Sequence, residues 1–452
     1  MDMDITAKTF DGQGGRDEFQ RKSIADKAIK LLKSDIDISP MVIDGSWGTG
    51  KTEFCHKLIN LMKEDETHSI IYIDAFKADH INEPLMTVLA EIIKTLPEDS
   101  RREGFIKKIL PAVRFGIKAL AKAGVSHLLR QDFADVAEDF TDEIEEATDK
   151  AIDATAELIL KEHIEAEKNL KTLQAALTEI ASNSPIVIFI DELDRCRPSF
   201  AIDMLEIIKH TFDVENVSFV LITNTQQLKA SINHCYGQAV DAQRYLDKFV
   251  KFRFELSSLS SRSYHSPVLA SKQHFFNLAS EKECLPNEYL NDNYFQDAIE
   301  DLVRSRSLSL REIETLILHI QIVQSLSESE TFSERKYFGY KLLRLIGVLL
   351  VCYKPELLDQ IKKGVVDAKS LGEFLGVKKL PTFESGRGVP KAFEVIMFIL
   401  AKESTENAEQ YKPSEENEVF WNSFENRFMG DHFVPQRAIN QIIETANIMA
   451  FE

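Results

Sequence analysis

The sequence predicts an α/β fold in which helices cover both faces of a mostly parallel sheet, followed by an all-α C-terminal region. Two observations support this prediction. Short apolar runs alternate with helical patterns over the first 260 or so residues, which is typical of parallel sheets. Beyond that point helical periodicity dominates and no stretch is rich in strand patterns.

The strands are predicted from apolar runs of strand length. We expect four or five of them: Met41–Ile43, Ser69–Ala75, Ile186–Asp191, Val217–Asn224 and, at an edge because its pattern alternates, Phe249–Leu256. In the C-terminal region helices are predicted at 267–280, 293–304, 310–326, 335–353, 391–402 and 434–448, with a serine-rich linker at 257–266.

Composition limits the class of protein. The chain has 452 residues, enough for two or three domains, and 44 % apolar with 28 % charged residues is ordinary for a globular protein. The formal net charge is 54 minus 73, or −19, which argues against general attraction to nucleic acid but not against a local basic groove.

Nothing in the sequence predicts export or membrane insertion. Five scattered cysteines without metal spacing favour a reducing cytoplasm, and the acidic N-terminus lacks the apolar core of a signal peptide. The apolar stretch 342–353 is too short to span a bilayer and predicts a buried core helix. Charges interrupt 109–129, which predicts an amphipathic surface helix.

A glycine-rich motif follows the first predicted strand. Residues 45–52 read Gly-Ser-Trp-Gly-Thr-Gly-Lys-Thr and fit the phosphate-loop pattern G-x-x-x-x-G-K-[ST] at every fixed position. Its glycines let backbone N–H groups turn towards a phosphate, at the positive end of the helix that follows. Lys51 is expected to reach the β- and γ-phosphates, and the Thr52 hydroxyl to ligate Mg²⁺. The residues expected to hold the nucleotide are Gly45, Ser46, Trp47, Gly48, Thr49, Gly50, Lys51, Thr52 and Glu53.

Two acidic residues end a buried strand and complete a hydrolytic pattern. Asp191 stands at the tip of the run 186–191, where it would hold Mg²⁺, and Glu192 could polarise the attacking water. Asn224 ends the next strand, and its amide could sense the γ-phosphate. Capping of the helix that begins near Gln226 is the alternative role for Asn224.

Further stretches narrow the set of phosphate-loop proteins that this sequence resembles. The block Asp191-Glu-Leu-Asp-Arg-Cys-Arg-Pro198, the segments Tyr72–Asp79 and Tyr245–Val250, and Trp47 inside the loop resemble the KAP family of P-loop NTPases. That family belongs to the additional-strand class, which is related to AAA+ and STAND ATPases. The resemblance covers roughly 10–260 and part of 300–320, and it implies an ATPase that acts as a switch or assembly motor.

The resemblance also suggests roles for basic residues. Arg195 matches the family block, where it would pair with Asp194 or reach a neighbouring subunit's nucleotide; a structural salt bridge is the alternative. Lys248 stands where related proteins place an arginine finger, and Arg244 is the other candidate. Arg311 opens a helix that resembles the sensor-2 helix, where it would touch the γ-phosphate; a surface arginine is the alternative.

The resemblance further suggests a domain plan. Related proteins often insert membrane-spanning helices between the two motifs, whereas the insert of this chain, 98–182, has no apolar span. Part of it, 132–168, is acidic with an alanine-rich seam of heptad spacing, which predicts a helix packing on another helix of the same chain or of a partner. The predicted domains are 1–97 with 183–258 as the NTPase core, 98–182 as the insert, 259–330 as a helical lid and 331–452 as a C-terminal helical domain.

We therefore expect a cytoplasmic ATPase that requires ATP and Mg²⁺ and drives a conformational or assembly switch. The resemblance makes a role in bacterial anti-phage defence plausible. The alternative is a nucleotide-gated scaffold with little turnover that recruits a separate effector. Self-association or a partner protein would use the insert or the C-terminal region. No second catalytic constellation stands out in the C-terminal region, so we expect the output of the ATPase not to come from a second catalytic site there.

Overall fold

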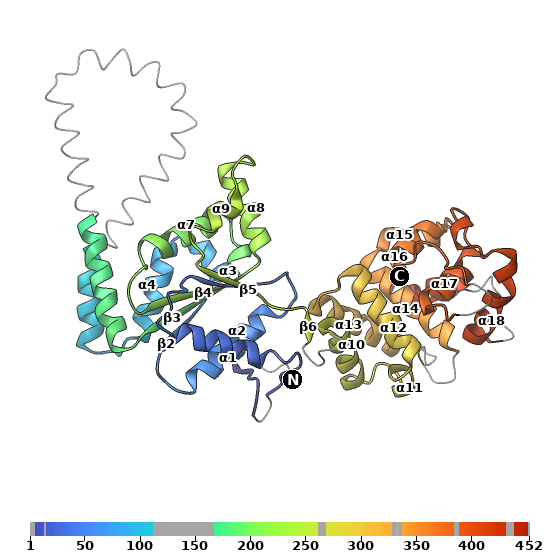
Figure 1. Cartoon of the computed structure of the whole chain (residues 1–452), viewed down its shortest axis with the longest axis horizontal. Helices are drawn as coiled ribbons and strands as arrows, with labels where there is room; N and C mark the ends of the chain where they lie inside the picture. Colours follow the sequence, from blue (N-terminus) through green and yellow to red (C-terminus); the bar gives the residue numbers. More distant parts are fainter. Residues whose placement is uncertain are drawn as a thin grey trace, which may run out of the picture. The chain divides into compact units, whose positions relative to one another are not determined.

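The structure of the chain is a computed structural model that describes residues 5–12, 15–111, 167–260, 268–327, 332, 337–383, 388–430 and 438–450. Its contacts divide the chain into two compact units (Figure 1). The N-terminal unit consists of Met1–Asp17, Arg21–Ser46 and Gly50–Leu256, and the C-terminal unit of Glu18–Gln20, Trp47–Thr49 and Ser257–Glu452.

The predicted insert is described only at its two ends. Both ends are helical, at 100–111 and 167–183. The alanine-rich seam and most of the predicted amphipathic helix lie outside the described residues, so both stay predictions.

The N-terminal unit is built on a five-stranded sheet. Its strands are β1 (Met41–Asp44), β2 (Ser69–Asp74), β3 (Ile186–Asp191), β4 (Val217–Thr223) and β5 (Phe252–Glu255). They lie in the order β2-β3-β4-β1-β5, and every neighbouring pair is parallel. The predicted strands are confirmed, with β5 at an edge as expected.

The register brings the ends of the strands to one edge of the sheet. Asp44 of β1 lies opposite Thr223 of β4, and Asp191 of β3 lies opposite Ile222 of β4 and Asp74 of β2. Strand β4 therefore separates the strand before the glycine-rich loop from the strand that ends in Asp191. Ligands of open parallel sheets bind at this carboxyl edge, so the arrangement determines where the candidate site lies.

Helices cover both faces of this sheet (Figure 1). The helices α1 (Lys22–Leu32) and α2 (Lys51–Lys63) pack on the face that carries Phe189. The opposite face, with Ile188, packs on α4 (Pro84–Thr95), α7 (Pro198–His210) and α8 (Thr225–Tyr236). All six residues of β3 are buried because the strand is covered on both sides, which explains its unbroken apolar run.

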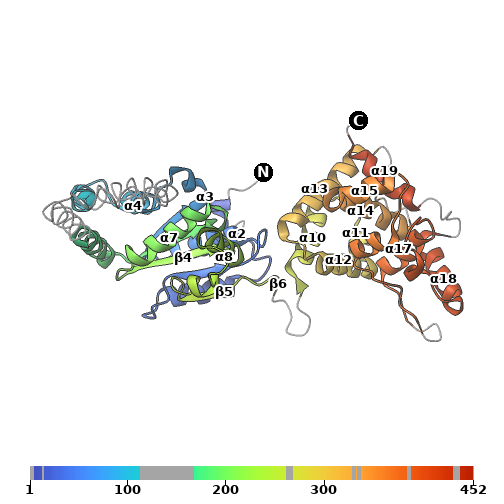
Figure 2. The same cartoon turned by 90° about the horizontal axis from the view of Figure 1, so that it is seen from above.

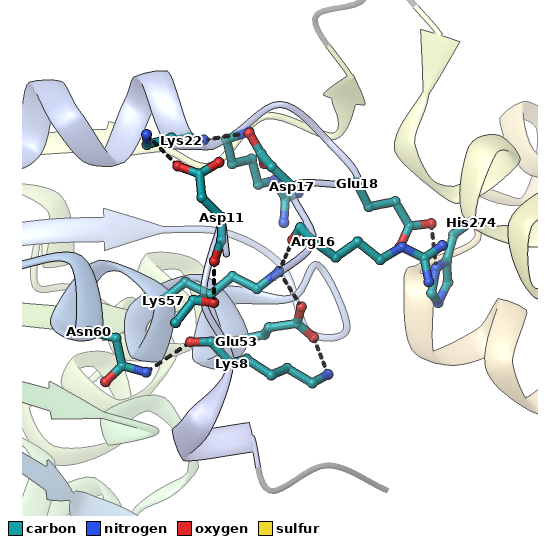
Figure 3. Close-up of polar contacts among 12 residues, drawn as sticks. Lys8, Asp11, Arg16, Asp17, Glu18, Lys22, Glu53, Lys57, Asn60 and His274 are labelled. Carbon is teal, nitrogen blue, oxygen red and sulfur yellow. Dashed lines mark hydrogen bonds and ion pairs between the residues drawn. The ribbon is translucent and has the colours of Figure 1, made fainter. Parts of the chain in front are cut away.

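The N-terminal segment lies along α2 (Figure 3). After the short helix η1 (Ile5–Ala7), the Lys8 ammonium lies 2.8 Å from a carboxylate oxygen of Glu53 on α2. The Asn60 amide on the same helix donates to the carbonyl oxygens of Thr6 and Lys8, each at 2.8 Å. These bonds hold the helix that follows the glycine-rich loop from its outer side.

From Ser257 onward, the C-terminal unit begins with a strand pair, and its other regular elements are helices in the part that the structure describes (Figure 2). The antiparallel strands β6 (Leu259–Ser260) and β7 (Val268–Leu269) border the predicted linker. The predicted helices are confirmed as α10 (Ala270–Glu281), α12 (Asn293–Arg306), α13 (Leu310–Leu326), α14 (Phe338–Tyr353), α17 (Ala392–Ala401) and α19 (Ala438–Ile448). The structure adds α11 (Asn287–Leu290), α15 (Pro355–Lys362), α16 (Ala368–Leu375) and α18 (Glu418–Met429).

One continuous hydrophobic core joins the helices of the C-terminal unit, from Phe275 to Ala446. Helix α14 is at its centre and packs against α13, α15, α18 and α19, which confirms that 342–353 is a buried core helix. None of the helices in the described ranges combines the length and apolar character needed to cross a membrane. Because the core runs across residue 330, the predicted border between lid and C-terminal domain stays a prediction.

An imidazole between two carboxylates links segments of the C-terminal unit that are distant in sequence, and Figure 3 shows its contact with one of them, Glu18. His274 on α10 places Nδ1 3.0 Å from Glu18 Oε1 and Nε2 3.3 Å from Glu314 Oε1. Its side chain is only 12 % exposed. Burial by itself would lower the pKa of His274, but the hydrogen bonds to Glu18 and Glu314 outweigh it and raise the pKa to about 9.

We expect this histidine to make stability depend on pH. Because the pKa of His274 is about 9 in the folded chain against 6.5 for an ordinary histidine, its stabilisation is complete below pH 6.5 and is lost as pH rises through 9. The full contribution is roughly 3 kcal/mol. Denaturant unfolding from pH 6 to 10 measures this contribution as the difference in the free energy of unfolding between wild type and His274→Gln. We expect that difference to shrink as pH rises.

The control is His319→Gln on α13, whose ring contacts the carbonyl of Thr315. That variant should follow the wild-type pH profile. A stability difference for His274→Gln that stays constant from pH 6 to 10 would refute a charged imidazole.

Candidate nucleotide-binding site

The glycine-rich loop connects the end of β1 to the start of α2. Gly50 caps α2 with φ 80° and ψ 28°, a left-handed conformation that glycine adopts without steric cost. Gly48 also has a positive φ, of 75°. The first N–H groups of α2 have no partners inside the helix, so the end of the loop presents the donors that an anion needs.

Lys51 lies against the loop itself. Its side chain is buried, with the residue 9 % exposed, and Nζ donates to the carbonyl oxygens of Gly45 at 2.7 Å and Ser46 at 3.1 Å. Burial lowers the pKa of Lys51, against the opposing charges of Asp194 and Asp191. The predicted phosphate-binding lysine is therefore held in place by atoms of the same loop.

The two predicted metal ligands meet at the tip of β3. Asp191 accepts a hydrogen bond from the Thr52 hydroxyl, and the backbone N–H of Glu192 donates to its Oδ1 at 2.8 Å. Burial raises the pKa of Asp191 to about 6, although these two hydrogen bonds oppose the shift. The strand and the loop thus bring a hydroxyl and a carboxylate together, and both groups suit Mg²⁺.

Glu192 has an unusual backbone conformation and an ion-paired side chain. Its φ of 60° and ψ of 24° are left-handed, which a residue with a side chain adopts only at a cost of about 1–2 kcal/mol. The short helix η3 (Leu193–Arg195) follows, and Nη1 of Arg195 lies 2.7 Å from Oε1 of Glu192. The carboxylate predicted to activate water is therefore paired with the arginine of the same motif.

The end of β4 makes two further contacts. The Thr223 hydroxyl donates to Asp194 Oδ1 at 3.1 Å, and both residues are buried. The side chain of Asn224 accepts the N–H of Gln226 at 3.1 Å, which makes it the N-cap of α8. The capping alternative for Asn224 is thus present in the structure, and sensing of a γ-phosphate by this residue stays a prediction.

The middle of the loop, Trp47–Thr49, groups with the C-terminal unit. The Gly48 carbonyl accepts the N–H of Leu310 at 2.9 Å, where α13 begins. A Cβ atom on Gly48 would lie 3.2 Å from Cβ of Arg311, so the predicted sensor arginine starts next to this glycine. Trp47 is 49 % exposed. The contact of Arg311 with a phosphate stays a prediction.

The remaining basic candidates contact residues of their own segment. Arg244, on α9 (Ala242–Leu246), has a side chain that is 87 % exposed and pairs with Asp241 at 3.3 Å. Nζ of Lys248 lies 5.2 Å from the centre of the Tyr245 ring. A role for either residue towards a neighbouring subunit stays a prediction.

The carboxylate of Glu53 contacts two lysines. Its oxygens lie 2.8 Å from Nζ of Lys8 and 2.8 Å from Nζ of Lys57. Burial would raise the pKa of Glu53, but the hydrogen bonds from Lys57 and Lys8 lower it. Any contribution of Glu53 to phosphate binding would therefore come from its backbone N–H in the first turn of α2.

Sequence reasoning missed two residues of this region, Asp44 and Tyr72. Asp44, the last residue of β1, accepts the N–H of Thr225 at 2.9 Å and its hydroxyl at 2.6 Å. Tyr72 of β2 donates to Asp191 at 3.3 Å. The only signal for Asp44 was its position just before the loop, and the sequence contains no local signal for Tyr72.

We expect Asp44→Ala to destabilise the N-terminal unit by about 1–3 kcal/mol, because the change leaves the N–H and hydroxyl of Thr225 without their acceptor. Asp44→Asn is the matched control, since its amide oxygen can still accept the N–H. Urea unfolding of the three proteins checks this, and equal midpoints for wild type and Asp44→Ala would contradict the anchoring role.

The fold and the site together define a P-loop NTPase of the additional-strand class. Strand β4 lies between the loop strand and the strand that ends in Asp191. The model of the KAP family P-loop domain matches residues 21–327, and the chain belongs to this family. No curated protein matches the chain. Among solved structures, C. elegans PCH-2 is similar at 12% identity and a TM-score of 0.31, over 75% of this chain and 69% of that chain.

Proposed function

We propose that the chain is a Mg²⁺-dependent ATPase in which hydrolysis drives a conformational or assembly switch. The observation that supports this most is the convergence of Lys51, Thr52 and Asp191, with Glu192 beside them, at the carboxyl edge of one sheet. A loop that only needed to hold a phosphate would not require a metal-binding carboxylate and a second acid at this edge.

Lys51 and the loop backbone would bind the phosphates. A triphosphate offers charged oxygens in place of the neutral carbonyls of Gly45 and Ser46 that Lys51 now contacts. Hydrogen bonds between charged partners are the stronger ones, so the exchange favours binding. The N–H groups at the start of α2 would complete the cradle.

Thr52 and Asp191 would hold Mg²⁺ together with phosphate oxygens. Among the described residues no group of three His, Cys, Asp or Glu could hold a metal without such help. A hydroxyl and a carboxylate that already share a hydrogen bond fit an ion that keeps several waters and few protein ligands. When bound, the ion would neutralise the negative charge that develops on the phosphate oxygens during hydrolysis.

Glu192 would accept the proton of the attacking water. The water oxygen forms a bond to the γ-phosphorus, the bond from that phosphorus to the bridging oxygen breaks, and ADP leaves with the electron pair. The proton passes to the Glu192 carboxylate. Because Arg195 lies 2.7 Å from this carboxylate, their ion pair has to loosen or rearrange before a water can take that place.

The same ion pair favours a second candidate function, a nucleotide-gated scaffold. With Arg195 2.7 Å from the Glu192 carboxylate, the place that an attacking water needs is taken by the guanidinium group. The chain would then bind ATP, hydrolyse it slowly and recruit a separate effector. Family resemblance is the support for a role of either candidate in bacterial anti-phage defence. The identity of the neighbouring genes offers the first test of that role.

Purified chain tested with and without Mg²⁺ separates the two candidates. Binding is followed with a fluorescent ATP analogue, turnover by phosphate release, and assembly by light scattering with and without ATP. Mg²⁺-dependent release supports the ATPase, whereas tight binding without release supports the scaffold. Absence of ATP binding would overturn both. A constant monomeric mass would remove any trans role of Arg195, Arg244 or Lys248.

A further inference from the structure

We propose that Tyr72 is a positioning residue that orients the carboxylate of Asp191 and thereby sets the affinity of the site for Mg²⁺. This inference rests on the proposed function, since it concerns the same metal site. Tyr72 lies outside both motifs: 119 positions separate it from Asp191 along the chain, and its hydroxyl donates to Asp191 Oδ2 at 3.3 Å.

The strand register explains how the two side chains meet. Strands β2 and β3 pair in parallel, with Tyr72 opposite Phe189 and Asp74 opposite Asp191. Side chains alternate between the faces of a strand, so Phe189 and Asp191 share a face. Phe189 and Tyr72 both pack in the core beneath α2, which places the tyrosine on the side from which Thr52 also reaches Asp191.

Tyr72 donates to the carboxylate oxygen of Asp191 that the backbone N–H of Glu192 does not contact. The backbone N–H of Glu192 donates to Oδ1 of Asp191, whereas the tyrosine hydroxyl donates to Oδ2. Donors on both oxygens fix the plane of the carboxylate and not only its position. Each oxygen keeps lone pairs, so a metal ion or its waters can still bind a carboxylate that is already oriented.

His56 holds the tyrosine ring in turn. Its ring centre lies 4.5 Å from that of Tyr72 at an interplanar angle of 43°, and the residue is 6 % exposed. His56 and Thr52 are four residues apart on α2, so they lie on the same face of that helix. One helix face therefore supports the aspartate directly through Thr52 and indirectly through His56 and Tyr72.

The hydroxyl of Tyr72 has a role that the packing of its ring does not explain. A phenylalanine would fill the same space, whereas a hydroxyl in a partly buried place is unfavourable without an acceptor, and Asp191 is that acceptor. Hydrogen bonds to metal-binding side chains typically change metal affinity by 10–100-fold. Because 3.3 Å is long for such a bond, we expect an effect near the lower limit, about 10-fold.

The test compares Tyr72→Phe with a matched tyrosine elsewhere in the N-terminal unit. The hydroxyl of Tyr236 donates to Glu206 at 3.2 Å, so Tyr236→Phe also removes a tyrosine–carboxylate bond. Binding of a fluorescent ATP analogue is titrated with Mg²⁺ and repeated in EDTA. For Tyr72→Phe we expect a Mg²⁺ midpoint about 10-fold higher, unchanged binding in EDTA and an unchanged melting temperature. Tyr236→Phe should match wild type in all three.

An Asp191→Ala background shows whether Tyr72 acts through the aspartate. Adding Tyr72→Phe to Asp191→Ala should change nothing further. A Mg²⁺ midpoint of Tyr72→Phe equal to wild type overturns the inference while the proposed function stands. Equal weakening with and without Mg²⁺ also overturns it, because that shows a general loss of structure. Wild-type binding that does not respond to Mg²⁺ overturns the proposed metal site itself.

Discussion

Replacement of Lys51 by alanine should abolish nucleotide binding at concentrations where the wild type is saturated. The side chain is buried in the loop and donates two hydrogen bonds to carbonyl oxygens there, so it already lies where phosphate oxygens would bind. A charged hydrogen bond contributes about 1.5–3 kcal/mol, which corresponds to a loss of roughly 10–100-fold in affinity for each phosphate contact. Phosphate release should fall to background.

Lys63→Ala is the control for this change. Lys63 is the last residue of the same helix and is exposed, so its loss removes a positive charge without touching the loop. Affinity for a fluorescent ATP analogue, measured by titration, should match wild type in the control and collapse in Lys51→Ala. Unchanged affinity in Lys51→Ala would refute the assignment of the site.

Glu192→Gln should separate binding from hydrolysis. Glutamine keeps the size of the side chain and can still accept a hydrogen bond from Arg195, but it cannot take a proton from water. General-base catalysis typically contributes 10²–10⁴-fold, so phosphate release should fall by about that factor while ATP affinity changes little. Single-turnover phosphate release and equilibrium ATP binding measure the two quantities on the same protein.

Glu300→Gln provides the comparison, because Glu300 also pairs with an arginine, Arg304, at 2.8 Å but lies in the C-terminal unit. It should hydrolyse ATP like wild type. If wild type and Glu192→Gln bind ATP and release phosphate equally slowly, Glu192 is not the base, and the scaffold is then the better description of the chain.

The strands and motifs of the N-terminal unit were predictable because their information is local. A strand buried on both faces is an unbroken apolar run, as in β3, and a phosphate loop has glycines and a lysine at fixed spacing. The helices missed in the C-terminal unit lacked such local signals. Helices α15 and α16 have only 8 residues each, too few for periodicity to show.

Side-chain partners within the site were only partly predictable. The meeting of Thr52 with Asp191 followed from the two motifs, whereas the ion pair of Arg195 with Glu192 did not. This ion pair forms at the left-handed backbone of Glu192. Glycine favours that conformation, so it cannot be predicted from a glutamate in the sequence. Asn224 has an amide suited to either predicted role, and only the structure shows it capping α8.

The sequence by itself determined the class of fold, the loop at 45–52, the acids at 191–192 and thus the chemistry that we propose for this chain. Only the tertiary structure decided which distant side chains support that chemistry. Tyr72 reaches Asp191 because β2 pairs with β3 in one particular register, and Asp44 reaches Thr225 because β4 lies beside β1. Strand order and register arise from packing over the whole sheet, so no local spacing of residues encodes them.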